Sequence, residues 1–296
     1  MKNKVFFFLL IISSGIFTFL LFTHSKDAEQ YKISLSTIKQ VSGKLTLAMS
    51  RATARSIPVN SIDEKELGDE IYSKLKNDSS ALRYLKENTY LANLIGSLTQ
   101  QRNKSFKYRV LLIESSVPNA FAFPGGVITI TTGLLNSLES ESELVAILAH
   151  EMGHIELSHC MDSVKYQLLS NKILTSDIGK IADFAHNIIL ANTFNQNQEK
   201  EADDYSFEFL KQSIYSPMGL SNALVRLQKI SKNEISHPIR DYFSSHPPLA
   251  HRIISYKNDA LHWNDDHPNL RRYIGNQNIK ERISFSEKTF APNEWT

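Results

Sequence analysis

The chain has 296 residues, a formal net charge of +2 and 42% hydrophobic residues. This hydrophobic content excludes a disordered chain, and the near-neutral charge, with no basic run, argues against nucleic acid as a partner. The single cysteine, Cys160, excludes an intramolecular disulfide and a cysteine-rich metal module. With only 11 Gly and 9 Pro, the composition favours helices over a many-turned all-β fold.

The first residues are typical of an export signal. Lys2 and Lys4 precede an apolar run from Val5 to Phe22, whose length is at the short end of membrane spans, about 17–25 residues. We therefore expect residues 1–25 to be a signal peptide or an N-terminal membrane anchor. The chain would then be periplasmic, anchored in the inner membrane and facing the periplasm, or secreted if the signal is cleaved. A buried N-terminal helix is the alternative, which the two lysines disfavour.

The next segments predict two helices and a small sheet. Residues 26–60 are expected to form a helix and a linker, and leucine and isoleucine spacing predicts a helix over 62–75. A second helix is expected to begin at Asp78 or Ser79 and to include Leu82, Leu85, Leu91, Leu94 and Leu98. Strands are predicted over 108–113, 119–123 and 127–131, with a Pro-Gly-Gly turn between the last two.

The second half of the chain is predominantly helical in pattern. Helices are predicted over 140–160, 196–211 and 217–230, and residues 161–193 form a long amphipathic stretch. That stretch can cover a cleft or lie on a membrane surface. No internal repeat is visible. The expected fold is therefore α+β and mostly helical, with a small sheet.

The motif with the clearest chemistry is His150-Glu-Met-Gly-His154 inside the helical pattern of 140–160. Two histidines four residues apart on a helix differ by ~40° in direction, so both imidazoles can reach one ion. Glu151 lies beside them, where it can accept a proton from an attacking water. A helix with surface histidines is the alternative, and the apolar residues just before His150 weaken it.

A zinc site needs a third protein ligand. If the helix continued, His159 and Cys160 would point ~160° and ~100° away from the pair, so neither is a good ligand. The better candidate is Glu199, because Asp203, four residues on, shares its helix face and can accept the other N–H of a ligand histidine. Glu201 would point ~200° away from Glu199. Taken alone, this acidic run is more often a solvated helix face.

These motifs together resemble the gluzincin metallopeptidases of peptidase family M48. The resemblance rests on the histidine motif and on Glu199-x-x-Ala-Asp203. It extends to three further elements: 119–126 with 132–135, which resemble the strand and turn before the active-site helix; His159, which falls at a histidine that often follows the motif; and 245–248 with Arg252, a late His-Pro…Arg element. The chain is most similar to the stand-alone, envelope-facing subgroup without tetratricopeptide repeats, rather than to HtpX-like members with several membrane spans or to BepA-like members.

The resemblance implies a zincin-type domain over 61–260 and a C-terminal tail over 261–296. It implies one zinc ion per chain, with His150, His154 and Glu199 as ligands and Glu151 as the base. Asp203, His159 and Arg252 are candidates for supporting these ligands, although Arg252 can equally be structural. His246 would lie near the metal, where it can occupy the open position, stabilise the oxyanion, or merely end a loop. Departures from the family pattern are Asn195, Gln196, Asp204, Ser206 and His251.

We expect a zinc-dependent endopeptidase that cleaves misfolded or unassembled envelope proteins. A substrate peptide could add as an extra strand beside 127–131 or, as we favour, beside Asn119, Ala120, Phe121, Ala122 and Phe123. One alternative is a mainly latent, chaperone-like quality-control factor whose zinc site is plugged by His246. Another is an interaction module with a purely structural zinc, which the presence of Glu151 disfavours.

Overall fold

The computed structural model describes residues 64–77, 84–85, 88–98, 104, 107–170, 177–191, 194–231, 242, 246, 250–290 and 292–296. All of them belong to one compact unit, residues 54–296. The expected signal or anchor over 1–25 and the helix and linker over 26–60 lie outside the described residues. None of the described helices is long and apolar enough to cross a membrane.

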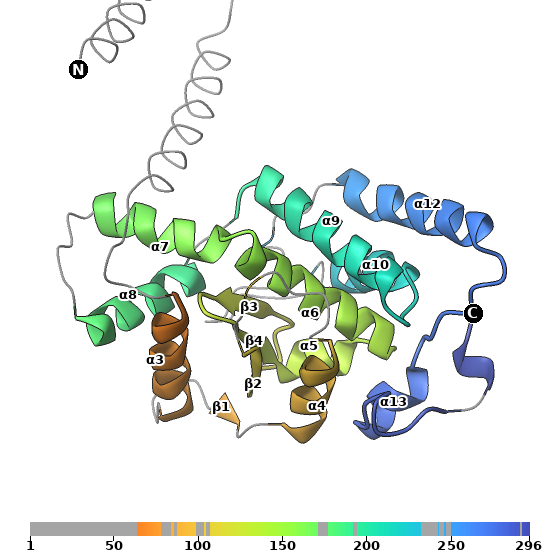
Figure 1. Cartoon of the computed structure of the whole chain (residues 1–296), viewed down its shortest axis with the longest axis horizontal. Helices are drawn as coiled ribbons and strands as arrows, with labels where there is room; N and C mark the ends of the chain where they lie inside the picture. Colours follow the sequence, from red (N-terminus) through yellow and green to blue (C-terminus); the bar gives the residue numbers. More distant parts are fainter. Residues whose placement is uncertain are drawn as a thin grey trace, which may run out of the picture. The chain divides into compact units, whose positions relative to one another are not determined.

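Helices dominate the described residues, with the labels of Figure 1. They are α3 (Glu64–Asn77), α4 (Thr89–Ser97), α5 (Thr132–Ser137), α6 (Glu141–Glu156), α7 (His159–Ser170), α8 (Ile178–Ala191), α9 (Gln196–Gln212), α10 (Met218–Ser231), α12 (Ala250–Asp266), α13 (Asn276–Glu281) and the 3₁₀ turn η2 (Pro292–Glu294). The strands are β1 (Tyr84–Leu85), β2 (Arg109–Ile113), β3 (Ala120–Phe123) and β4 (Val127–Thr131). The predicted mostly helical α+β fold is confirmed.

The four described strands form one mixed sheet in the order β1-β2-β4-β3. β2 and β4 are parallel, whereas β3 pairs antiparallel with β4 and β1 pairs antiparallel with β2. The predicted turn between β3 and β4 contains Gly125 and Gly126, with φ of 75° and 87°. A Cβ on Gly125 would lie 2.4 Å from the carbonyl oxygen of Glu64, so α3 can pack closely on this turn only because glycine stands there.

Helix α6 is the centre of the fold, and every one of its residues is buried. It contacts the sheet at β3 and β4 and helices α7, α9, α10 and α13 (Figure 1). The Ser140 hydroxyl accepts the N–H of Glu143 at its start. The N–H groups of Glu141 and Ser142, in the first turn of α6, donate to the carbonyls of Gly275 and Ile274. The segment expected as a C-terminal tail thus caps the helix that carries the histidine motif.

Helices α6 and α9 approach each other closely. A Cβ on Gly153 of α6 would lie 3.1 Å from the Cα of Ala202 on α9, and Ser206 of α9 donates to the carbonyl of Ala146. Helix α9 starts with a capping box in which the Asn195 side chain accepts the N–H of Gln198 while the Gln198 side chain accepts the N–H of Asn195. Because Gly153, Ala202 and Ser206 are small, the histidine motif of α6 and the acidic motif of α9 lie side by side.

Two predicted helices differ from the structure. The helix expected from 78 or 79 to 98 is wrong as one element, because Leu85 lies in β1, paired with β2, and α4 begins only after the cap Asn88. Asp78, Ser79 and Leu82 lie outside the described residues. The helix expected over 140–160 is interrupted: α6 ends at Glu156, and Ser158 adopts a left-handed φ of 62° before α7 begins.

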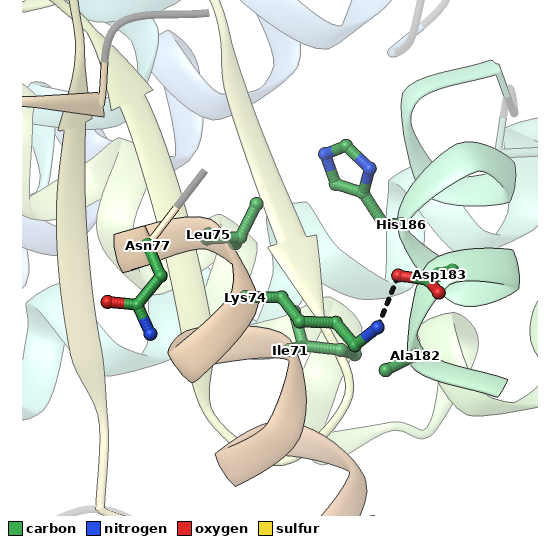
Figure 2. A pocket seen from close by; sticks show the side chains of 7 residues that line it. All are labelled: Ile71, Lys74, Leu75, Asn77, Ala182, Asp183 and His186. Carbon is green, nitrogen blue, oxygen red and sulfur yellow. Dashed lines mark hydrogen bonds and ion pairs between the residues drawn. The ribbon is translucent and has the colours of Figure 1, made fainter. Parts of the chain in front are cut away.

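The amphipathic stretch over 161–193 contains part of α7 and all of α8, and both helices pack against β3. Helix α8 also packs against α3. Between them lies a cavity of about 330 Å³, lined by Ile71, Lys74, Leu75, Asn77, Ala182, Asp183 and His186 (Figure 2). Lys74 Nζ lies 2.6 Å from Asp183 Oδ1 and joins the two helices across the edge of this cavity.

Candidate metal centre

Four side chains that are far apart in the sequence converge at one buried point. Helix α6 supplies His150 and His154, α9 supplies Glu199, and His246 comes from the segment before α12. One ligand-capable atom from each of the four lies within 4.8 Å of the other three. All four residues are at most 1% exposed.

The distances show that the ligand-capable atoms of these four residues face a common centre. His150 Nε2 and His154 Nε2 are 3.1 Å apart, and His246 Nδ1 lies 3.3 Å from His150 Nε2. The Glu199 carboxylate completes the set, with Oε1 3.4 Å from His154 Nε2 and Oε2 3.7 Å from His150 Nε2. The helical spacing of the motif thus places both imidazoles on the side of α6 that faces α9.

His150 is oriented by the carboxylate that the sequence singled out beside Glu199. Its Nδ1 lies 2.9 Å from Asp203 Oδ1. Asp203 is fully buried and accepts from Arg252 twice, from Nε to Oδ2 at 2.6 Å and from Nη2 to Oδ1 at 2.8 Å. Arg252 Nη1 also donates to Glu199 Oε2 at 3.2 Å. One arginine therefore binds both of the buried acidic residues of α9.

His154 is in contact with two aromatic neighbours. The ring of Phe194 stacks on it at 3.8 Å between centroids. Its Nδ1 lies 3.0 Å from Nδ1 of His159. The expectation that His159 points ~160° away held only for a continuous helix, and α6 ends before His159. The left-handed turn at Ser158 returns His159 toward His154.

Glu151 has an unusual environment for a carboxylate. It is fully buried, and neither of its oxygens has a hydrogen-bond partner among the described residues. His246 Nε2 lies 3.5 Å from its Oε1. Burial raises the pKa of Glu151 above its ordinary value, although the neighbouring His246 and His150 act in the opposite direction.

Protonation states at the centre follow from burial and from neighbouring charges. Burial holds the pKa of His154 well below its ordinary value, which keeps the imidazole neutral. Burial alone would raise the pKa of Glu199, but His246, His154 and His150 hold this pKa well below its ordinary value. Burial would likewise lower the pKa of His246, but Glu199 and Glu151 raise it. The ring of Tyr242 stacks on His246 at 4.5 Å.

The residues expected to receive a substrate strand form the outer strand β3 and the residue before it. Ala120, Phe121, Ala122 and Phe123 are all buried, as is Asn119. Cys160 of α7 donates from Sγ to the carbonyl of Ala122 at 3.2 Å, and burial raises the pKa of this thiol well above its ordinary value. Cys160 is therefore a packing residue beside the strand rather than a nucleophile.

The donor set fits zinc. Two imidazoles and a carboxylate are the ligands of many catalytic zinc sites, and the two Nε2 atoms, 3.1 Å apart, are close enough to bind one ion. The Glu151 carboxylate, which accepts no hydrogen bond from the described residues, lies next to this set. A purely structural interpretation of the cluster would leave that buried carboxylate unexplained.

The fold and this cluster define a zinc-dependent peptidase of the kind built around two histidines and a distant glutamate. The chain belongs to peptidase family M48, whose family model matches residues 85–259. It is therefore a zinc metallopeptidase, a hydrolase that acts on peptide bonds and whose substrates are peptides or proteins.

Three relatives illustrate the similarity. Metalloprotease LoiP of Escherichia coli (strain K12) is 31% identical, covering 57% of this chain and 68% of LoiP. Metalloprotease YcaL of the same organism is 24% identical, covering 85% of this chain and 95% of YcaL. The beta-barrel assembly-enhancing protease of Yersinia pestis is 26% identical, covering 68% of this chain but only 44% of that protein.

Three residues at the centre escaped the sequence analysis. Glu201 lies 2.9 Å from His159 Nε2, Phe194 stacks on His154, and Tyr242 stacks on His246. Helical geometry pointed to Glu201 only as a residue facing away from Glu199, which is correct, but it could not place His159 on that side. Phe194 lies between α8 and α9, where periodicity carries no information.

Proposed function

We propose that this chain is an endopeptidase in which His150, His154 and Glu199 hold one zinc ion and Glu151 is the general base. The observation that carries the proposal is the buried carboxylate of Glu151, which lies beside the convergent imidazoles and accepts no hydrogen bond from the described residues. Burying a carboxylate that accepts no hydrogen bond costs free energy, so such a group indicates a functional site.

A zinc ion held by His150, His154 and Glu199 would polarise the scissile carbonyl and an attacking water. Glu151 removes a proton from that water during attack and then delivers it to the leaving amine. Burial raises the pKa of Glu151, which makes its carboxylate a better proton acceptor than an ordinary carboxylate. Asp203 and Arg252 fix the His150 ring and the Glu199 carboxylate, so that these groups need no reorganisation.

The direct test is Glu151→Gln. We expect cleavage of a disordered protein such as casein to vanish, while zinc content stays near one ion per chain. Lys200→Gln is a suitable control, because Lys200 is exposed on α9 and pairs only with Asp204 among the described residues. Phenanthroline should abolish the activity of the wild type, and added zinc should restore it. Persistent cleavage by Glu151→Gln would remove Glu151 from its role.

We further propose that the substrates are misfolded or unassembled envelope proteins and that the chain is exported to the periplasm. Support comes from the charged and apolar segment at residues 1–25 and from a relative whose name refers to β-barrel assembly, a fold of outer membranes. Comparing the envelope proteome of cells with wild-type enzyme and with Glu151→Gln would identify accumulating substrates. Accumulation of cytosolic proteins alone would contradict the proposal.

A second candidate function is a mainly latent quality-control factor. It is favoured by His246 Nδ1, which lies 3.0 Å from Glu199 Oε1 and within the donor cluster. A closed set of four protein ligands is typical of zinc sites that do not catalyse. His246→Ala should raise proteolysis if His246 blocks the site, and should lower it if His246 assists the reaction.

A further inference from the structure

The candidate zinc ligand His154 is the first of three side chains in a continuous line. His154 Nδ1 lies 3.0 Å from His159 Nδ1, and His159 Nε2 lies 2.9 Å from Glu201 Oε2. The two imidazoles are fully buried, whereas the Glu201 side chain is 51% exposed. The line therefore runs from the centre of the site to the surface of α9.

The positions of the hydrogens follow from the roles of the ring nitrogens. A neutral imidazole carries one hydrogen, and a nitrogen that binds a metal cannot carry it. If Nε2 of His154 faces the metal, its hydrogen is on Nδ1, so His159 Nδ1 must accept it. His159 then carries its own hydrogen on Nε2, where the Glu201 carboxylate accepts it. A carboxylate can only accept, so it imposes this direction on both rings.

We propose that His159 and Glu201 are positioning residues for His154, because they fix the tautomer that presents the unprotonated Nε2 of His154 to the metal. The proposal rests on the proposed function only in taking His154 as a zinc ligand. In it, Glu201 does for His154, through one intervening imidazole, what Asp203 does directly for His150.

The backbone is built to bring His159 into this position. Ser158 is held in the left-handed region, at φ 62°, which is unfavourable for residues other than glycine. Lys104 stabilises the turn, since its Nζ donates to the carbonyl of Ile155 at 2.8 Å and to the hydroxyl of Ser158 at 2.9 Å. Strained backbone is often found at functional sites, so the turn at Ser158, stabilised by Lys104, supports a functional role for His159 in addition to the connection of α6 and α7.

The two orienting devices differ in their exposure to water. Asp203 is fully buried and is clamped by Arg252, whereas water competes for Glu201. We therefore expect Glu201 to contribute less to zinc affinity than His159, which is buried and touches the ligand directly.

The test uses the full chain and five variants, of which four probe the line of side chains and the fifth, His154→Ala, probes the metal centre itself. His159→Leu removes the acceptor for His154, whereas His159→Asn keeps an acceptor oxygen near the position of Nδ1. Glu201→Met removes the terminal acceptor at an exposed position, where folding should be unaffected. Glu208→Met is the matched control, because Glu208 lies on the same helix, is also exposed and pairs with Lys211 instead.

Two quantities are measured: the zinc dissociation constant, by competition with a chelator, and the tautomer of His154 in the metal-free protein, by ¹⁵N NMR of the imidazole rings. His159→Leu should weaken zinc binding about 10- to 100-fold, and Glu201→Met less than that. His159→Asn should remain within a few-fold of the wild type, and Glu208→Met should equal it. The hydrogen of His154 should stay on Nδ1 in the wild type and His159→Asn, and should distribute over both nitrogens in His159→Leu.

Unchanged zinc affinity and an unchanged His154 tautomer in His159→Leu would overturn the inference. Equal losses in His159→Asn and His159→Leu would also overturn it, because they would indicate packing rather than hydrogen bonding. His154→Ala separates this failure from a failure of the proposed function. If His154→Ala binds zinc as the wild type does, the proposed metal centre itself is wrong.

Discussion

Arg252 grips Asp203 through two parallel hydrogen bonds, of 2.6 Å from Nε and 2.8 Å from Nη2. Both side chains are buried, and a third bond from the same guanidinium reaches Glu199. This paired geometry is the strongest form of arginine–carboxylate contact, and here it lies behind the proposed zinc ligands rather than on the surface.

Arg252→Gln should therefore destabilise the metal-free chain by about 3–5 kcal/mol, because it leaves Asp203 and Glu199 buried without their cation. Urea unfolding monitored by circular dichroism measures the change. Arg271→Gln is the control, since Arg271 is exposed and contacts the carbonyl of Pro292 and the ring of Trp295 rather than a buried carboxylate. Its effect should be below about 1 kcal/mol. Equal effects of the two substitutions would contradict the prediction.

Glu151→Met should stabilise the metal-free chain while abolishing proteolysis. The buried carboxylate lacks hydrogen-bond partners among the described residues, so its removal relieves about 1–3 kcal/mol of desolvation penalty. Thermal unfolding in the presence of a chelator measures this gain. A lower melting temperature for Glu151→Met than for the wild type would show that the carboxylate is satisfied in the folded chain.

Gly153→Ala tests the close approach of α6 and α9. The added methyl group would lie 3.1 Å from the Cα of Ala202, so the helices must separate. We expect a loss of about 1–3 kcal/mol in stability together with weaker zinc binding, because the proposed ligands come from both helices. Gly96→Ala on α4 is the control, since its Cβ would have nothing within 4 Å. It should stabilise the chain by about 0.5–1 kcal/mol.

Glu141 should make stability depend on pH. Its Oε1 accepts from the Tyr215 hydroxyl at 2.7 Å and from the N–H of Phe285 at 2.9 Å, but burial raises its pKa above 4.5. The folded chain therefore binds more protons than the unfolded chain at this group. Stability should fall as pH rises from about 4.5 to the raised pKa of the folded chain.

Glu141→Gln should flatten this dependence, as measured by urea unfolding at a series of pH values between 4.5 and 8. Glu208→Gln, at an exposed position paired with Lys211, should leave the slope of the wild type unchanged. A slope that persists in Glu141→Gln would assign the dependence to another group.

The helix motifs were predictable from sequence because each is local. The spacing of His150 and His154 on α6, and of Glu199 and Asp203 on α9, follows from helical geometry alone. Their convergence needed knowledge of packing, and Gly153 indicates close packing only after its partner Ala202 is known. The three longer strands were likewise evident, from apolar runs that flank a Pro-Gly-Gly turn.

The errors arose where tertiary contacts override local pattern. Leu85 continues the spacing of a leucine-rich helix, yet pairing with β2 places it in a strand. Ser158 is neither Gly nor Asn, so no helix-terminating residue marked the left-handed turn there. Because that turn was not predicted, helical geometry pointed His159 away from His154 and gave no indication of its contact with Glu201.

Residues 272–296 support the start of α6. Arg272 and Thr296 exchange two backbone hydrogen bonds, and the Glu294 carboxylate receives the N–H groups of Asn276 and Gln277. The loop held in this way supplies the carbonyl of Gly275 to α6. Removing a few residues from the carboxyl end, or fusing an affinity tag directly to it, would weaken these contacts. It would thereby weaken the support of α6, which carries both histidines. Recombinant versions are better tagged elsewhere.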